Sequence, residues 1–176
     1  MRYYTGVGSR ETPGAILDLM REIASCLAEE GYVLRSGGAA GADTAFELGA
    51  GYSSQIFIPW DGFNGRSSTT TNVFTLSDGK KDLAYKLAQE IHPAWDKCGV
   101  GAKALHARNI YQVLGLELDR PSKFLICYAQ PISNGVKGGT NTAVQVALRN
   151  GIKVFNLYET ETLERFEKYV SERNRV

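Results

Sequence analysis

The stretch Tyr32-Val-Leu-Arg-Ser-Gly-Gly-Ala-Ala-Gly-Ala-Asp43 decides how this chain is expected to fold. A short apolar run breaks into three glycines, and a helix-forming segment begins directly after them. This order predicts a buried strand, a tight turn and a helix whose first backbone amides have no partners within the helix. The helix macrodipole places partial positive charge at the same point, so a turn of this kind attracts phosphate.

A second turn of the same kind, Gly138-Gly-Thr-Asn-Thr142, lies far downstream. A single turn is equally well explained by glycines that only permit a tight connection between a strand and a helix. Two such turns on one sheet favour a shared binding site over that explanation.

The composition is that of an ordinary globular domain. The chain has 176 residues, of which 43% are hydrophobic and 22% charged, and this fits one domain over residues 1–176 with a sizeable core. No apolar run approaches the roughly 20 residues that cross a bilayer, and no apolar signal-peptide core follows Met1. We therefore expect a cytoplasmic protein with no membrane partner.

The charge balance limits the kind of partner. A net charge of +1 argues against the broad basic field that drives nonspecific binding of nucleic acid. Any recognition of phosphate is therefore expected to be local.

The cysteines carry no recognisable spacing. Cys26, Cys98 and Cys127 are widely separated, and only His92 and His106 accompany them. This spacing indicates neither a disulfide framework nor a zinc site. We expect reduced, structural thiols, no metal and no required cofactor.

Strand and helix signals alternate along the chain. Strands are expected at residues 3–7, 32–35, 54–58, 73–76, 124–128 and 154–157, and helices at 13–30, 43–48, 80–91, 102–116, 140–149 and 159–173. This alternation predicts an α/β fold, a three-layer Rossmann-like sandwich with a mostly parallel sheet and helices on both faces. Residues 59–78 form a long, turn-rich connection, for which we expect the role of a lid.

In an open parallel sheet, ligands bind beyond the carboxyl ends of the strands, near a switch in strand order. The segments that follow the predicted strands carry glycine, hydroxyl and polar residues, so we expect them to build one pocket. The residues expected to bind a ligand there are Gly8, Ser9, Arg10, Ser36, Gly37, Gly38, Gly41, Ala42, Asp43, Pro59, Trp60, Lys137, Gly138, Gly139, Thr140, Asn141 and Thr142. The first turn fits neither the dinucleotide fingerprint nor a Walker A loop, so neither hydride transfer nor ATP hydrolysis is expected.

The predicted helix at 102–116 adds polar residues to this pocket. Arginine grips phosphate in a bidentate manner and a neighbouring asparagine orients a ribose or base edge, so Arg108 and Asn109 join the expected ligand-binding residues. Gln112 is attributed to a solvated helix surface. Neither histidine has a visible acid or nucleophile partner, so neither is given a catalytic role.

Two further features leave alternatives open. Trp60 and Phe63 either stack on a base or pin the long connection to the body of the protein. Asp43 and Glu47 lie one helical turn apart, and they are either two acids at the pocket mouth or a helix cap beside a surface acid.

Three segments together resemble the SLOG superfamily of Rossmann-like nucleotide-binding proteins. They are Leu34-Arg-Ser-Gly-Gly-Ala-Ala-Gly-Ala-Asp-Thr-Ala45, Lys137-Gly-Gly-Thr-Asn-Thr-Ala143 and Gly151-Ile-Lys-Val-Phe-Asn156. The first is similar to the S-G-x-A-x-G-x-D-x-x-A pattern of DprA/Smf-like proteins, and the second to the glycine-threonine turn that precedes a helix in the DprA-like and LOG-like branches. The resemblance covers nearly the whole chain and is strongest to small stand-alone proteins of the YspA and YpsA type.

The resemblance implies a site for a nucleotide or a nucleotide-derived ligand, either ADP-ribose-like or a nucleoside monophosphate, in a sensor or sequestering module. A homodimer is expected by analogy with related folds.

The LOG-type branch implies an alternative function. Its enzymes carry P-G-G-x-G-T-x-x-E, and the glutamate acts with an upstream arginine to cleave the bond between base and ribose phosphate. The matching run here has Lys137 in place of the proline, Asn141 in place of the third glycine and Gln145 in place of the glutamate. Glutamine cannot act as an acid or base, so an N-glycosidase acting on nucleoside monophosphates is the alternative, with Arg108, Glu47 and Asp43 as its candidate catalytic residues.

The DprA-like branch implies a second alternative, the binding of single-stranded DNA. That role calls for a basic groove with aromatic platforms, and the near-neutral chain offers only scattered basic residues. A nucleic-acid partner is therefore less favoured than a small nucleotide.

Overall fold

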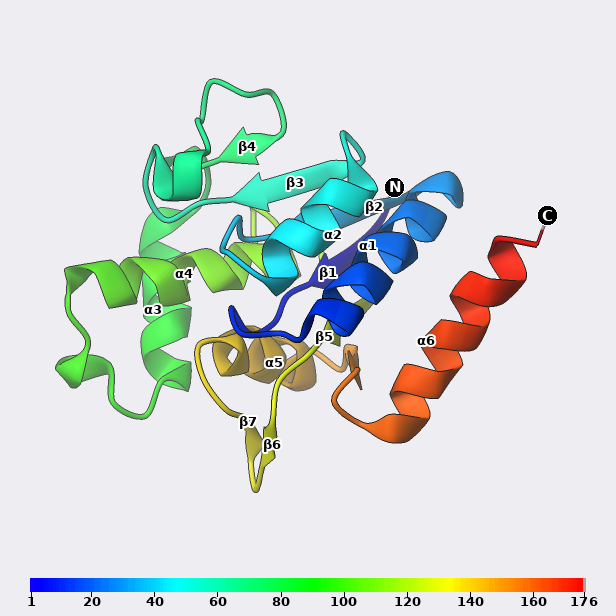
Figure 1. Ribbon diagram of the computed structural model, residues 1–176. Coiled ribbons are helices and arrows are strands. Elements are labelled where there is room, and N and C mark those ends of the chain that lie inside the picture. Colours follow the sequence, from blue (N-terminus) through cyan, green and yellow to red (C-terminus); the bar gives the residue numbers. More distant parts are fainter. Residues whose placement is uncertain (176) are drawn as a thin grey trace.

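A computed structural model describes residues 1–175 of the chain. Its middle layer is a six-stranded sheet in the order β4-β3-β2-β1-β5-β8, and every pairing in it is parallel (Figure 1). The strands are β1 (Arg2–Gly6), β2 (Tyr32–Ser36), β3 (Ser54–Phe57), β4 (Val73–Phe74), β5 (Phe124–Cys127) and β8 (Lys153–Asn156). The chain runs outward from β1 to β4 on one side and from β5 to β8 on the other, so the strand order switches between β1 and β5.

Helices cover both faces of the sheet. The helices α1 (Gly14–Glu29), α2 (Ala42–Ala50) and α6 (Thr160–Arg173) lie on one face, and α3 (Lys81–Ile91), α4 (Val100–Leu114) and α5 (Thr140–Arg149) on the other. The predicted three-layer α/β sandwich is therefore confirmed. None of the helices in residues 1–175 combines the length and the apolar character needed to cross a membrane.

Each face of the sheet has its own hydrophobic core. Side chains alternate between the two faces of a strand, and β5 shows the result: Leu125 and Cys127 join the core under α3, α4 and α5, while Ile126 joins the core under α1 and α2. All three are fully buried. A strand covered on both faces is apolar at successive positions, which is why this run was recognisable in the sequence.

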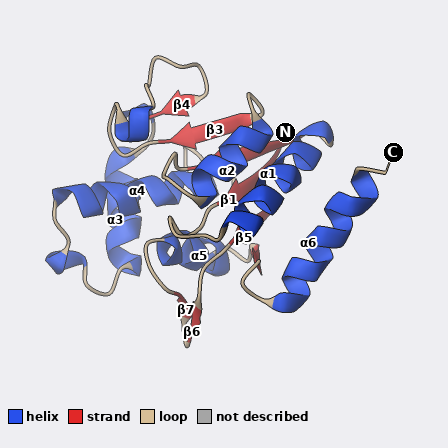
Figure 2. Cartoon of the chain, viewed as in Figure 1, coloured by secondary structure: helices blue, strands red, loops and turns tan. Residues whose placement is uncertain are grey.

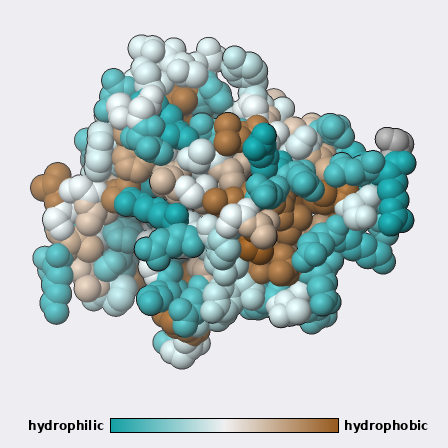
Figure 3. Space-filling view, in the orientation of Figure 1, coloured by the Kyte–Doolittle hydropathy of each residue, from teal (hydrophilic) through white to brown (hydrophobic). Residues whose placement is uncertain are grey.

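The C-terminal helix α6 closes the edge of the sandwich beside α1. Phe166 and Tyr169 are partly buried against the core of that face, and the Tyr169 hydroxyl donates a hydrogen bond of 2.5 Å to Glu30. In the space-filling view, hydrophilic side chains dominate the outer side of α6, and apolar side chains gather between it and the neighbouring helix (Figure 3).

The long connection between β3 and α3, for which the role of a lid is expected, is fastened to α2 and to the first glycine turn. Arg66 pairs with Glu47 at 3.0 Å and donates to the Thr44 hydroxyl at 3.1 Å. Asn64 donates to the carbonyl oxygen of Gly38 at 3.0 Å. These bonds are made between segments that lie apart in the sequence, so the turn-rich composition of the connection did not reveal them.

Two short strands were not predicted from the sequence. β6 (Pro131–Ile132) and β7 (Gly135–Val136) form an antiparallel hairpin that projects from the end of β5 (Figure 2). Each has only two residues, too few for an alternating pattern to be visible.

The contact between α1 and α2 depends on a glycine. A Cβ at Gly49 would lie 2.1 Å from the carbonyl oxygen of Arg21 and 2.8 Å from the Cβ of Ala24. Only a residue without a side chain lets the two helices approach this closely.

We expect Gly49→Ala to lower the free energy of unfolding by about 1–3 kcal/mol, because the added methyl overpacks the helix contact, although alanine is the better helix former. Gly14→Ala is the matched control, since nothing lies within 4 Å of a Cβ at that helical glycine, and it should change stability by less than about 0.5 kcal/mol. Urea unfolding followed by circular dichroism measures both. Equal stability of the two variants would contradict the role given to Gly49.

Candidate functional site

A cavity of about 380 Å³ lies where the strand order switches, beyond the carboxyl end of β1. Four parts of the chain line it: residues 7–11 after β1, Ala39 and Asp43 from the first glycine turn and the start of α2, one side of α4, and residues 137–140 with Ala143 at the start of α5. This volume falls within the range of small-molecule pockets. The expected convergence of the segments after β1 and β2 with the second glycine turn is therefore present.

The second glycine turn presents free backbone amides to the cavity. Gly138 and Gly139 precede α5, and Thr140 is its first residue. All three line the cavity, and none of their N–H groups has a hydrogen-bond partner among residues 1–175. Gly138 has a φ of +87°, a conformation that favours glycine. Three successive unpartnered amides at a helix N-terminus are an arrangement suited to an anion.

Arg108 is a buried cation in the wall of the cavity. Its Nη1 donates to the carbonyl oxygens of Gly37 and, at 3.1 Å, Phe57, and its Nε donates to the Asn109 side chain at 3.0 Å. Its Nη2 has no partner in the described part of the chain, and it is not among the fully buried unpartnered atoms. The guanidinium is therefore held rigidly with one nitrogen left for a ligand.

Burial lowers the pKa of Arg108 to about 10, while the nearby carboxylate of Asp43 opposes this shift. Arg108 therefore keeps its charge at neutral pH.

Asn109 lines the cavity as expected, whereas Gln112 differs from its expectation. The Asn109 side chain is engaged within the protein, because it accepts from Arg108 and donates to the carbonyl oxygen of Gly139 at 3.1 Å. The expectation of a solvated surface for Gln112 is wrong: this side chain is 1% exposed and lines the cavity. The reason is that α4 is buried around its whole circumference from Ala107 to Leu114.

The glycines of the first turn are required by packing. A Cβ at Gly37 would lie 2.0 Å from the Gln112 Nε2, and one at Gly38 would lie 2.7 Å from the side chain of Arg66. At Gly41 it would lie 2.6 Å from the backbone oxygen of Arg10. These three glycines lie behind the cavity wall, since protein groups occupy the space that we had expected a ligand to take.

Ser36 and Ala42, also expected to bind a ligand, support the first turn from outside the cavity. The Ser36 hydroxyl donates to the carbonyl oxygen of Gly6 at 2.6 Å. Ala42 is fully buried, and its amide donates to the carbonyl oxygen of Ser9 at 3.4 Å. The polar side chain of Ser36 therefore forms a hydrogen bond that links the neighbouring strands β2 and β1.

The turn after β1 lines the cavity as expected with Gly8, Ser9 and Arg10. The Ser9 hydroxyl accepts the amide of Glu11 at 3.0 Å, and the Ser9 amide donates to Tyr128 at 3.1 Å. The Arg10 side chain is exposed at the rim.

Asp43 is the buried acid of the cavity. Helix α2 begins at Ala42 with Gly41 as its N-cap, so Asp43 lies within the first turn instead of capping it. Its Oδ2 accepts the amide of Ala39 at 3.3 Å. Burial raises the pKa of Asp43 to about 6, and the charge of Arg108 only partly offsets this shift.

The structure separates Glu47 from Asp43. Glu47 forms its ion pair with Arg66 outside the cavity wall. Their spacing of one helical turn was not enough to bring both acids to the pocket, because a partner from the long connection holds Glu47 on another side of α2.

Pro59 and Trp60 do not line the cavity. Pro59 is buried, and the Trp60 ring packs edge to face against Phe63 with a centroid distance of 5.5 Å. Phe63 in turn lies 5.5 Å from the Arg108 guanidinium. This geometry corresponds to the alternative in which the aromatic pair pins the long connection to the protein body.

Asn141 and Thr142 also point away from the cavity. The Asn141 Oδ1 accepts hydrogen bonds from the Val136 amide at 3.1 Å and from the Gln145 side chain at 3.2 Å. Asn141 and Gln145 therefore hold the β6–β7 hairpin in place. The Thr142 hydroxyl lies 2.8 Å from Nδ1 of His106. Of the second turn, only its first three residues and the preceding Lys137 reach the cavity.

His106 is a cavity residue that the sequence did not reveal. It lines the wall on α4, and its ring lies 4.4 Å from that of His92. Burial, His92 and Arg108 together lower the pKa of His106 to about 4, so this imidazole is neutral at physiological pH.

Comparisons with known proteins show the fold and leave the family open. No protein-family model matches the sequence, and no curated protein matches it significantly. A solved structure of the Chlamydomonas rheinhardtii Moco carrier protein matches with a TM-score of 0.50 and 17% identity, over 97% of this chain and 84% of that one. A structure of DNA processing protein A from Helicobacter pylori, described by its single-stranded DNA binding, matches with a TM-score of 0.43 and 14% identity, over 97% and 81% of the two chains. The first likeness is consistent with the Rossmann-like fold that the SLOG resemblance implies.

Proposed function

We propose that the cavity binds a small molecule through a phosphate group, a nucleotide or a nucleotide-derived ligand, and that the chain acts as a sensor or sequestering module. The observation that supports this most strongly is the run of three unpartnered amides at Gly138, Gly139 and Thr140, in the same cavity as the free Nη2 of Arg108. Both groups donate hydrogen bonds, and the arginine adds a full positive charge. Phosphate oxygens are the acceptors that match this set.

The charge of the cavity supports an anionic ligand. Its lining includes the cations Arg10, Arg108 and Lys137 and the acids Glu11 and Asp43. Three cations against two acids leave the cavity lining with an excess of positive charge even when both acids are ionised. The side chain of Gln112, which also lines the cavity, supplies a further polar group for the rest of the ligand.

A ligand panel tests the proposal directly. AMP, GMP, NAD and ADP-ribose are compared by thermal unfolding, with Moco added because the Chlamydomonas rheinhardtii carrier shares the fold and a single-stranded oligonucleotide added as the DNA alternative. A ligand present at a hundred times its Kd stabilises the native state by about 2.7 kcal/mol, which raises Tm by roughly 5–10 °C for a chain of this size. We expect this shift with at least one nucleotide. The absence of a shift with every nucleotide would refute the proposal.

A pair of variants at Gly139 tests the backbone amides. Gly139 has a φ of −62°, which suits proline, and a Cβ there meets no protein atom within 4 Å. Gly139→Pro removes the amide hydrogen, and Gly139→Ala keeps it, so their difference isolates this donor. We expect the proline variant to bind the ligand identified by the panel about 10–100-fold more weakly than the alanine variant, as for a lost hydrogen bond to a charged group.

Isothermal titration measures this difference, and circular dichroism checks that both variants retain the fold. Equal affinities of the two folded variants would show that the Gly139 amide does not contact the ligand.

The placement of Asp43 favours a second candidate function, hydrolysis of the N-glycosidic bond of the bound nucleotide. Asp43 is a cavity acid beside Arg108, with a pKa near the range that suits general acid catalysis. The third candidate residue, Glu47, does not line the cavity because it is paired with Arg66. Gln145, at the position of the LOG-type glutamate, holds the hairpin. Chromatography for free base separates the two functions, since a sensor releases none.

Asp43→Asn tests the state of this carboxyl group. A folded-state pKa of about 6, against an ordinary value of 3.8, means that the native protein binds the proton more tightly than the unfolded chain. Wild-type stability therefore falls as the pH rises from about 4 to 7 through this group, by about 2 kcal/mol. The asparagine variant has no proton to lose at this position, so its free energy of unfolding lacks this pH dependence. The difference in stability between the variant and wild type should therefore shift in favour of the variant by the same amount between pH 4 and pH 7.

Urea unfolding at the two pH values measures the change. A relative stability that does not depend on pH would contradict the buried, proton-binding carboxyl group. In the hydrolysis alternative, the same variant should also lose release of the base.

A further inference from the structure

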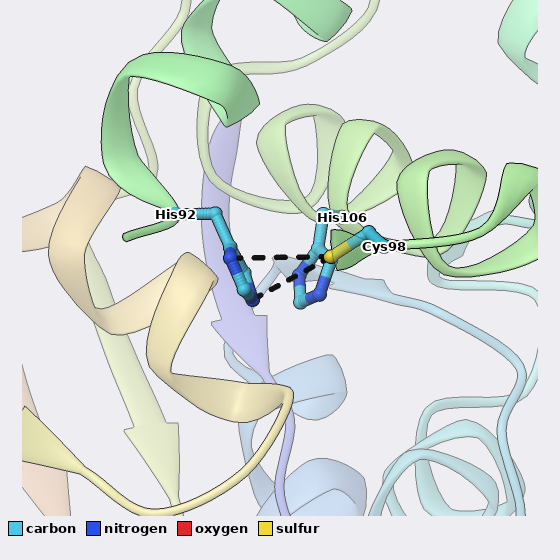
Figure 4. A group of neighbouring side chains, drawn as sticks. All are labelled: His92, Cys98 and His106. Atoms are coloured by element: carbon cyan, nitrogen blue, oxygen red, sulfur yellow. Dashed lines mark hydrogen bonds between the residues drawn. The ribbon is translucent and has the colours of Figure 1, made fainter. Parts of the chain in front are cut away.

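Three metal-ligating side chains converge beside the cavity, although their spacing in the sequence gave no sign of it. His92 follows the end of α3, Cys98 lies in the connection to α4, and His106 lies on α4 itself. One potential ligand atom from each lies within 4.8 Å of the others. The Cys98 sulfur is 4.0 Å from both ring nitrogens of His92, and the His106 side chain lies beside them (Figure 4).

The surroundings of His106 prepare it for a cation. Its Nδ1 lies 2.8 Å from the Thr142 hydroxyl, a position in which Nδ1–H can donate and leave the lone pair on Nε2. A metal-bound histidine characteristically donates its other ring N–H to such an acceptor. The ring is partly buried at the edge of the cavity, so a bound ion would be partly shielded from solvent.

His92 and Cys98 have only weak interactions to give up. The Nδ1 of His92 accepts the amide of Ala94 at 3.1 Å. A neutral imidazole has one lone pair, so this single bond is what a metal ion displaces. The Cys98 thiol makes a contact of 3.6 Å with the carbonyl oxygen of Ala94, and it is partly exposed and reachable from solvent.

We propose that His92, Cys98 and His106 form a binding site for a thiophilic divalent cation, with Zn²⁺ as the best fit, and that its fourth coordination position faces the cavity. Two imidazoles and one thiolate are a donor set that zinc uses, and three protein ligands leave one position open. His106 is the member of the cluster that lines the cavity, so a cavity ligand can approach the ion from that side. Cys98 binds as the thiolate and releases its proton.

The local charges favour an anion in the open position. Zn²⁺ and one thiolate leave a net charge of +1, and Arg108 lies close enough to influence His106. The metal cluster contains no carboxylate. Hydroxide, chloride or the anionic group of a cavity ligand would therefore complete the coordination, although binding of the cation does not depend on the nucleotide proposal.

Cobalt substitution tests the site with the metal alone. We expect Co²⁺ to bind at one equivalent per chain and to produce a thiolate-to-cobalt charge-transfer band and the visible d–d absorption of a four-coordinate ion. Zn²⁺ should displace it, as measured with a chromophoric chelator. Cys98→Ser should abolish the charge-transfer band, while Cys26→Ala, which alters a cysteine buried in the opposite core, should retain it. Absence of the band in wild type, or its persistence in Cys98→Ser, would overturn the proposal.

The Thr142 hydroxyl supplies a test of the ligand geometry. Thr142→Val removes the acceptor for His106 and should weaken Zn²⁺ binding by about 10–100-fold, whereas Thr142→Ser keeps the hydroxyl and should retain the affinity. Thermal unfolding of both metal-free variants establishes that they are folded. Equal Zn²⁺ affinities in the two folded variants would refute the proposed orientation of His106.

Discussion

The buried guanidinium of Arg108 is the interaction on which the geometry of the cavity depends. From the middle of α4 it holds the carbonyl oxygens of Gly37, after β2, and Phe57, at the end of β3. Through Asn109 it is linked to Gly139 and so to the start of α5. Burying a cation is costly unless its donors are satisfied, and here backbone carbonyls satisfy it. Three segments that are distant in sequence are thereby fixed around one charge.

This arrangement gives two similar glycine turns different roles. In the first, glycine is needed because Arg108, Gln112 and neighbouring groups pack directly against the backbone. In the second, no atom of residues 1–175 lies within 4 Å of a Cβ at Gly138 or Gly139, and the amides of these cavity-lining residues have no partner there. A glycine turn is thus a way to bring any group close to the backbone, and the group is a protein side chain in one case and, as we propose, a ligand in the other.

The wall formed by α4 brings the phosphate-binding and metal-binding proposals together. Arg108 and His106 lie on the same helix and both line the cavity. Thr142 contacts His106 two residues after the open amide of Thr140. A cation bound by His106 would add to the positive charge of the cavity, so the two proposed sites favour each other electrostatically when the cavity ligand is an anion.

Local patterns in the sequence were sufficient for the fold. Apolar runs, helical periodicity and glycine punctuation act over a few residues, and they predicted the strands of the parallel sheet, the six helices covering it and the carboxyl edge as the place of the cavity. The same patterns identified Arg108 and the second turn as polar features near that edge.

Only the tertiary structure decided which polar groups face the cavity. Gln112 is buried because α4 is covered on all sides, and Glu47 is drawn to Arg66 by a contact across the long connection. His92, Cys98 and His106 meet because the chain reverses between α3 and α4. The orientation and partner of each of these side chains depend on packing between separate elements, so no spacing along the chain encodes them in a form that can be read from one sequence.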